Sequence, residues 1–129
     1  MRTPPLRSIL IIAAGLLLSG FAPDTRPITE KDIWQFTWIG DPQISPDGSR
    51  IAYARVVVDA KHTGYETSIW TVPTGGGDPE RLTSGTHDSQ PRWSPDGSRL
   101  AFVRSPEKDG KAAPPQVFVL SMRGGEPVQ

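Results

Sequence analysis

Residues 45–53 read SPDGSRIAY and residues 94–102 read SPDGSRLAF, so one phrase returns 49 positions along the chain. In each copy the proline presets the backbone for the second position of a turn, the aspartate tolerates the third, and the glycine takes the left-handed conformation that follows. Each phrase therefore predicts a tight turn that leads into an apolar strand. A repeat of this length is typical of one four-stranded blade of a β-propeller.

The repeat continues on both sides of the turn. Matching segments are DPQI at 41–44 and QPRW at 90–93, IWTV at 69–72 and VFVL at 117–120, and GGDP at 76–79 and GGEP at 124–127. The spacing falls from 49 to 48 in the intervening loop, where a deletion is tolerated. This agreement indicates a duplicated unit.

The matched segments predict the strands of each unit. We expect first strands at 42–45 and 91–94, second strands at 50–57 and 99–104, and third strands at 68–72 and 116–121, with polar loops at 58–67 and 105–115. The fourth strand of the first unit is expected to begin at Arg81. Gln129 is the matching position of the second unit, so we expect that strand to be cut short. The chain is then expected to be the front piece of a longer protein or a truncated gene product.

Both faces of the second strands are apolar, which a sheet with one face in water would avoid. Large side chains (Ile51 and Tyr53, or Leu100 and Phe102) alternate with smaller ones (Ala52 and Ala54, or Ala101 and Val103). This alternation predicts blades that pack on each other, with large residues against small ones. The predicted fold class is therefore all-β: a partial β-propeller of about two four-stranded antiparallel blades, after an N-terminal signal helix.

The chain divides into four predicted parts. Residues 1–22 have the layout of a secretory signal peptide: a basic start, an apolar run at 9–18 that is too short for an ordinary transmembrane helix, and small residues before a cleavage site after Ala22. An uncleaved membrane anchor is the alternative. Residues 23–40 form a lead-in segment in which Thr29 is expected to cap a short helix through the amide of Asp32. Residues 41–83 are blade one and residues 84–129 are the truncated blade two.

Composition narrows the function. The chain has 14 basic and 14 acidic residues and no stripe of positive charge, which disfavours nucleic-acid binding. It has no cysteine, so it forms neither a disulfide nor a thiolate metal site. The 13 glycines and 14 prolines lie largely at repeated positions and indicate turns.

The sequence shows none of the common catalytic motifs. The sequence contains no Gly-x-Ser-x-Gly nucleophile elbow, and the run at 75–77 lacks the lysine and helix of a phosphate-binding loop. The neighbours His87, Asp88 and Ser89 do not make a triad, because sequence neighbours rarely reach the required geometry. His62 and His87 lack metal-ligand spacing. We therefore predict no catalytic, cofactor-binding or metal-binding residue in this chain.

Tryptophans and arginines are the other candidate ligand contacts in the sequence. Trp70 and Trp93 lie at repeated strand positions and are expected to pack in the core, whereas Trp34 and Trp38 lie outside the repeat, and a carbohydrate or peptide platform is the alternative. Two further pairs recur at equivalent positions, Arg55 with Arg104 and Asp47 with Asp96. We expect the arginines to hold a neighbouring strand or loop, with a channel-lining role as the alternative, and the aspartates to form turns.

The unit SPDGSR, followed by a small-apolar strand, IWTV and GGDPERLT, resembles the propeller repeats of the prolyl oligopeptidase family of serine peptidases, which includes dipeptidyl and acylaminoacyl peptidases. It also resembles the periplasmic propeller protein of the Tol system. The resemblance covers about residues 28–129. The passage from a signal peptide through ITEKDIW at 28–34 directly into DPQISPDG at 41–48 favours the peptidases, because the Tol protein would place a separate α/β domain first.

The family resemblance implies a parent protein with a C-terminal α/β-hydrolase domain as the partner of the propeller. A Ser–Asp–His triad on that domain would cleave short peptides, and the propeller would limit access by size. None of the triad matches a position here. The expected function is thus the substrate-gating propeller of an exported serine peptidase in the periplasm or secreted, with contact to a membrane only through the export signal. The alternative is a non-enzymatic, Tol-like periplasmic propeller that binds protein partners.

Overall fold

The structure is a computed structural model that describes residues 26–108 and 111–129. The predicted signal peptide at 1–22, with its signal helix, lies outside these residues. Within the described part of the chain, no helix has the length and apolar character needed to cross a membrane.

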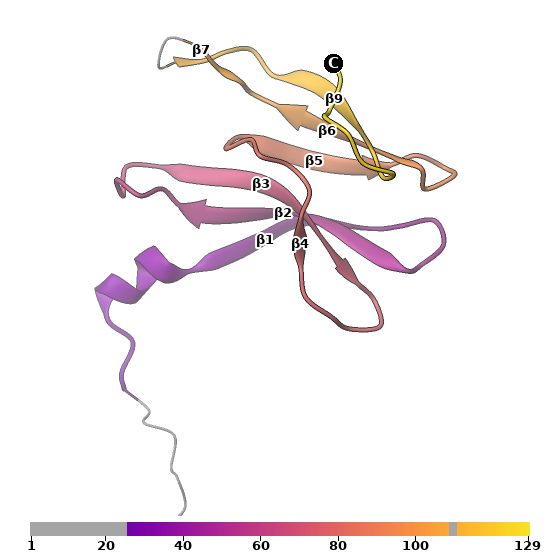
Figure 1. The fold of residues 1–129 in the computed structure, drawn as a ribbon. Coiled ribbons are helices and arrows are strands. Elements are labelled where there is room, and N and C mark those ends of the chain that lie inside the picture. The colour runs from indigo at the N-terminus through magenta and orange to yellow at the C-terminus, as the bar shows by residue number, and fades with distance from the viewer. Residues whose placement is uncertain (1–25, 109–110) are drawn as a thin grey trace, which may run out of the picture.

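Two antiparallel sheets make up the fold, and they lie one above the other in Figure 1. Sheet one has the order β1 (Thr37–Ile44), β2 (Arg50–Val58), β3 (Tyr65–Pro73) and β4 (Glu80–Arg81). Sheet two has the order β5 (Asp88–Trp93), β6 (Arg99–Arg104) and β9 (Gln116–Ser121). The all-β prediction, with its two antiparallel repeats, is confirmed.

The beginning of a fourth strand is visible in sheet two. Val128 and Val119 exchange two backbone hydrogen bonds of 2.8 and 3.0 Å. In sheet one the equivalent pair is Thr71 of β3 with Glu80 of β4, each 48 positions earlier. Sheet two therefore has three strands and one further bridge at the predicted place of its fourth strand.

The repeated turns form as their sequence predicts. Gly48 and Gly97 have φ angles of 71° and 69°, and their amides donate to the carbonyls of Ser45 and Ser94 at 2.8 and 2.9 Å. Glycine adopts this backbone region at no steric cost, because it has no Cβ atom. Each turn joins the first two strands of its sheet, so it fixes their register.

Strand β1 is longer than predicted. It begins at Thr37, where the sequence suggested Pro42, because Trp38 and Ile39 are good strand residues that pair with Val56 and Arg55 of β2. Strand β3 likewise begins at Tyr65 rather than at residue 68.

A bulge that the sequence did not reveal interrupts the first strand of both sheets. The pairing register shifts between Gly40 and Gln43 and again between Ser89 and Arg92. Inside the two bulges, Asp41 and Gln90 have φ angles of 47° and 55°. The bulge thus belongs to the repeated unit. In both sheets it precedes a proline, Pro42 or Pro91, which has no amide proton to donate to the neighbouring strand.

The loop at 105–115, predicted as an irregular solvent loop, contains a small hairpin of β7 (Glu107–Lys108) and β8 (Lys111–Ala112). Backbone groups of an exposed loop gain from pairing with each other, which accounts for the difference.

The predicted short helix exists as the 3-10 helix η1 (Glu30–Gln35), and Thr29 is its N-cap residue in a capping box with Asp32. The amide of Asp32 donates to the carbonyl of Thr29 at 3.0 Å. The Thr29 amide and hydroxyl both donate to the Asp32 carboxylate, at 2.6 and 2.9 Å. The carboxylate is the stronger acceptor, so the threonine hydroxyl is a donor here.

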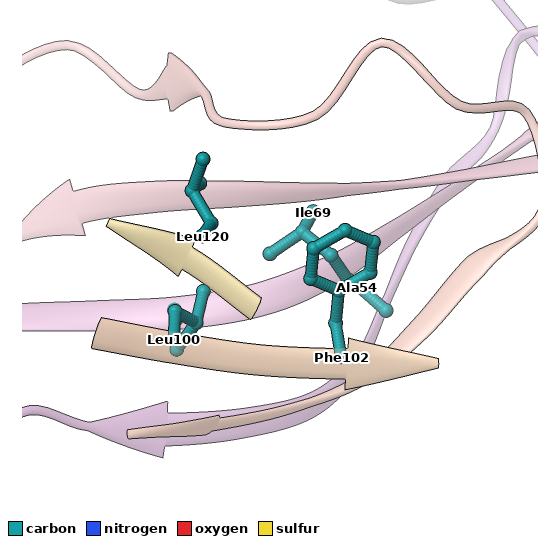
Figure 2. Packing of buried hydrophobic residues seen from close by; sticks show 6 residues of the cluster. Ala54, Ile69, Leu100, Phe102 and Leu120 are labelled. Carbon is teal, nitrogen blue, oxygen red and sulfur yellow. The ribbon is translucent and has the colours of Figure 1, made fainter. Parts of the chain in front are cut away.

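The core lies between the two sheets. Ala52, Ala54 and Ile69 of sheet one form one cluster with residues of sheet two; the latter are Leu100, Phe102 and Leu120. Figure 2 shows Phe102 and Leu100 of β6 directed toward Ala54 and Ile69. The predicted packing of large residues against small ones is confirmed, and each large side chain buried there contributes about 1.5–3 kcal/mol.

Candidate functional site

A buried ion pair links the start of β5 to the end of β6. Asp88 is fully buried, and it pairs in register with Arg104. The guanidinium donates from Nε to Oδ1 at 2.6 Å and from Nη2 to Oδ2 at 2.8 Å. This two-point geometry is the strong form of an arginine–carboxylate contact. The Asp88 carboxylate holds the pKa of Arg104 above its usual value, because it stabilises the charged form.

The segment that connects the two sheets, between β4 and β5, contacts this pair at Gly85. A Cβ atom added to Gly85 would be 2.7 Å from Cγ of Asp88, closer than any side chain tolerates. Arg81 also donates to the carbonyls of Thr83 and Gly85, at 2.7 and 3.3 Å. Asp88 and Arg81 therefore both contact the connection from sheet one to sheet two.

Both repeated arginines lie over aromatic rings. The guanidinium of Arg55 is 4.6 Å from the ring centroid of Trp70, and that of Arg104 is 5.2 Å from the centroids of both Phe102 and Phe118. Arg104 holds the neighbouring strand through hydrogen bonds, as expected of a structural arginine. Arg55 makes the same contact with an aromatic ring but lies opposite Ile39 rather than an aspartate.

The two repeated turns border a shallow cavity of about 310 Å³ between the sheets. It is lined by Ser45, Asp47, Ser49, Arg50, Trp93, Asp96, Gly97 and Met122. The Ser45 hydroxyl, followed by the Ser49 amide and hydroxyl, lowers the pKa of Asp47 to about 2. Ser94 and Ser98 likewise lower the pKa of Asp96. Both carboxylates are thus held ionised by their own turns, which is the turn-forming role predicted for them.

Aromatic side chains near the start of β1 make two groups, Trp34 with His62, and Trp38 with Phe36 and Tyr65. Trp34 stacks on His62 with ring centroids 4.8 Å apart, and Trp38 contacts Phe36 and Tyr65 edge-on at 6.1 and 5.7 Å. Trp34 and Trp38 remain 46% and 39% exposed, so they are surface residues.

The other two tryptophans differ from each other. Trp93 packs against the core cluster and donates its indole proton to the carbonyl of Gln43 at 3.0 Å. Trp70 is half-buried, outside the core cluster, and donates to the Ser68 hydroxyl at 3.0 Å. The prediction of core packing is confirmed for Trp93 and is wrong for Trp70, because Trp70 lies on the face of sheet one that points away from sheet two.

The histidines do not meet a catalytic partner in this part of the molecule. Asp88 binds Arg104, and the carbonyl of His87 accepts a hydrogen bond from the Ser105 amide at 3.1 Å. Among residues 26–108 and 111–129, no three histidine, aspartate or glutamate side chains gather where they could hold a metal ion. That the chain lacks catalytic and cofactor-binding residues stays a prediction.

The Asp88–Arg104 pair was not found from the sequence. The repeat marks Arg104, but in the sequence Asp88 stands out only as a neighbour of His87. A signal was available, because Asp88 replaces Ile39 at the repeat position directly across from the arginine.

Comparison with known proteins supports the peptidase resemblance. No protein-family model matches the sequence. The uncharacterized peptidase YuxL of Bacillus subtilis is 40% identical over 100 residues, which is 77% of this chain and 15% of that protein. The chain therefore spans a small part of the curated relative.

Solved structures show the same fold. The acylaminoacyl peptidase of Pyrococcus horikoshii superposes with a TM-score of 0.61 and 24% identity, over 76% of this chain and 14% of that chain. The β-propeller domain of the Trilobed protease from Pyrococcus furiosus, described as having an open velcro topology, gives a TM-score of 0.56 and 22% identity, over 72% of this chain and 27% of that chain. With the paired sheets and the repeated turns, these findings identify the chain as a β-propeller portion of a prolyl oligopeptidase-like peptidase.

Proposed function

We propose that this chain is the part of an exported serine peptidase that restricts access to the catalytic domain of the same polypeptide. The observation that carries the proposal is the directional packing of two equivalent sheets, in a chain whose curated relative is a peptidase. Sheets stacked in this way around an axis form a propeller with a central channel, and a channel of limited width would act as a size filter.

Short peptides are the proposed substrates. The contact between the sheets supports this, because Ala52 and Ile69 are fully buried in one cluster with Leu100, so the two sheets pack closely at the core. Substrates would then enter along the propeller axis or beside the propeller, and chain size would decide which of them reach the catalytic domain.

The enzymatic half of the proposal is tested on the full-length gene product. A fluorophosphonate probe should label a serine outside residues 1–129, within a Gly-x-Ser-x-Gly motif. Absence of labelling, in a protein made only of further propeller repeats, would favour the non-enzymatic propeller that binds protein partners.

The gating half needs a separate measurement. In the full-length enzyme, Ala52→Leu should loosen the contact between the sheets and raise the hydrolysis of long peptides relative to dipeptides, whereas the surface change Glu80→Gln should leave that ratio unchanged. An equal effect of Ala52→Leu on both substrate lengths would contradict a size filter.

The proposed export is tested by the mass of the protein recovered outside the cytoplasm. Cleavage after Ala22 would leave Pro23 as the first residue. Recovery of the uncleaved chain in the membrane would instead support the anchor.

A further inference from the structure

Each repeated turn contains an aspartyl–glycyl bond, one between Asp47 and Gly48 and one between Asp96 and Gly97. Aspartate rearranges most readily at such a bond, because glycine has no side chain to hinder the approach of its amide nitrogen to the carboxyl carbon. Both aspartates are exposed to water. The two turns therefore contain the groups that isoaspartate formation requires.

The rearrangement has two steps. In the first, the glycine amide nitrogen loses its proton and bonds to the carboxyl carbon of the aspartate, one carboxyl oxygen leaves as water, and a succinimide ring results. In the second, water opens the ring at either of its carbonyl carbons, which restores aspartate or forms isoaspartate. The water lost in the first step equals the water taken up in the second, so no other reactant is consumed. The neutral carboxyl is the reactive form, since the charge of a carboxylate makes its oxygen a poor leaving group.

The folded turn engages the nitrogen that would attack. The amide of Gly48 donates to the carbonyl of Ser45 at 2.8 Å, and the amide of Gly97 donates to that of Ser94 at 2.9 Å. To reach the carboxyl carbon, the nitrogen would have to leave this hydrogen bond and lose the proton that it donates. The hydrogen bond that closes each turn therefore also withholds the nucleophile.

The folded turn also holds the carboxylate in its unreactive, charged form. Asp47 accepts hydrogen bonds from the Ser45 hydroxyl at 2.6 Å and from the Ser49 amide at 3.0 Å, and the Ser49 hydroxyl lies 2.9 and 2.8 Å from its two oxygens. Asp96 accepts the equivalent donors of its own turn at 2.6, 3.1 and 2.7 Å. These contacts lower the pKa of Asp47 to about 2, against about 3.9 for a free aspartate, so its neutral form is roughly a hundredfold rarer.

We propose that Asp47 and Asp96 are latent sites of isoaspartate formation, which the closed turns protect and which react once a turn opens. Isoaspartate adds a methylene group to the main chain and leaves its free carboxylate directly on Cα, out of place for the serine donors. The first two strands of the sheet then lose the turn that sets their register, so the opening becomes irreversible. The inference goes beyond the proposed function and does not require the parent protein to be a peptidase.

The first test measures succinimide turnover in the full-length gene product, incubated in water enriched in ¹⁸O. Each opening of the ring inserts one heavy oxygen, whether aspartate or isoaspartate results. Trypsin releases the two sites in separate peptides, 32–50 and 93–99, so mass spectrometry follows each site alone. We expect both sites to take up label about a hundredfold more slowly in the folded protein than in the same protein unfolded in urea. Equal rates in the two states, or no label even in urea, would overturn the proposal.

A matched pair of variants separates the opening of one turn from unfolding of the whole protein. Ser49→Ala removes the hydroxyl from Asp47 and leaves the contacts of Asp96 intact, and Ser98→Ala does the reverse. A hydrogen bond to a charged group shifts an equilibrium about tenfold or more, so each variant should take up label faster by about this factor at its own site and at an unchanged rate at the other. Faster labelling at both sites, or at neither, would refute protection by the turn itself.

Refolding tests whether the modification makes the opening irreversible. The full-length protein is kept in urea for increasing times and returned to buffer, and native molecules are separated from those that fail to refold. Isoaspartate at 47 and 96, measured in the same two tryptic peptides, should be depleted in the native fraction and enriched in the other. Equal isoaspartate content in the two fractions would contradict the loss of the turn.

Discussion

The buried ion pair of Asp88 and Arg104 contacts two strands of sheet two and the connection between the two sheets. The carboxylate has no exposed surface, and the guanidinium side chain is 19% exposed, so water screens the pair poorly. The pair joins two strands of sheet two. The Asp88 carboxylate also lies directly against Gly85, in the connection from sheet one. Removing one member leaves the other buried without its counter-charge.

We therefore expect Asp88→Asn to destabilise the chain by about 3 kcal/mol, in the range for breaking a buried pair. Denaturant unfolding, followed by tryptophan fluorescence, measures the loss as a lower midpoint at unchanged slope. Glu80→Gln is the matched control, because Glu80 is 65% exposed and only 3.7 Å from Arg50; it should cost less than about 1 kcal/mol. Similar losses of unfolding free energy for the two variants would show that the buried pair contributes no more to stability than the exposed one.

At the scale of the turn, the serine hydroxyls and amides bind the aspartate in its charged form. Ser45 donates to Asp47 at 2.6 Å, and the Ser49 amide donates to it at 3.0 Å. The same contacts recur for Asp96, with distances of 2.6 and 3.1 Å. The turn is thus a unit whose stability depends on ionisation of its aspartate.

This dependence has a definite sign. The pKa of Asp47 is lowered to about 2 in the folded chain, and a free aspartate has a pKa of about 3.9. The folded state therefore binds the proton less readily, and the contribution of Asp47 to stability is complete above about pH 4 and is lost as the pH falls toward 2.

Asp47→Asn should consequently flatten the fall of unfolding free energy between about pH 4 and pH 2, while Asp96→Asn should act in the same direction. Urea unfolding at a series of pH values gives the slope for each variant. A slope equal to that of the unchanged chain would mean that the turn contacts are not maintained in solution.

The equivalent residues Ala52 and Ala101 allow a test of which face of the second strand is packed in the core. Ala52 of β2 is fully buried against sheet two, whereas the equivalent Ala101 of β6 is half-buried on the outer face. Ala52→Leu should cost about 1–3 kcal/mol through overpacking, and Ala101→Leu should cost little in this chain. Thermal unfolding of the two variants measures the difference. A larger loss from Ala101→Leu would mean that the core is assigned to the wrong face.

The elements that could be predicted were those with local signals. Proline and glycine at fixed places predicted the turns, and alternation of large and small residues predicted the second strands and the packing of large residues against small ones. The bulges at Asp41 and Gln90 were missed, because no residue type marks them and only their position before a proline is shared. The Asp88–Arg104 pair was missed because strand register, which brings its members together, depends on that bulge.

At the scale of the whole molecule, the outer faces and edges are the main feature. Several large apolar residues stay exposed, among them Ile39 at 65%, Ile44 at 64% and Val117 at 60%. Strand β9 meets only one residue of a fourth strand, Val128, so much of its edge is unpaired among the described residues. Such faces and edges favour association with other polypeptide.

We expect the 129-residue chain, taken alone, to be marginally stable and to associate. Its melting temperature and sedimentation coefficient should both depend on protein concentration. Calorimetry and analytical ultracentrifugation at several concentrations test this, with a charged substitution on the outer face, Val117→Lys, as a variant that should reduce association. A cooperative melt that is independent of concentration would contradict the expectation.

The small-against-large contact in the core has a consequence for ancestry. Each unit has large apolar side chains on one face of its second strand and small ones on the other face. In the core, the large face of sheet two packs on the small face of sheet one. A duplicated unit would therefore be complementary in shape to the unit on either side of it. Ring growth by gene duplication then needs no simultaneous change at two surfaces. Because a large face must meet a small face, all units have to be stacked in the same direction. A unit stacked in the opposite direction would place two large faces or two small faces together.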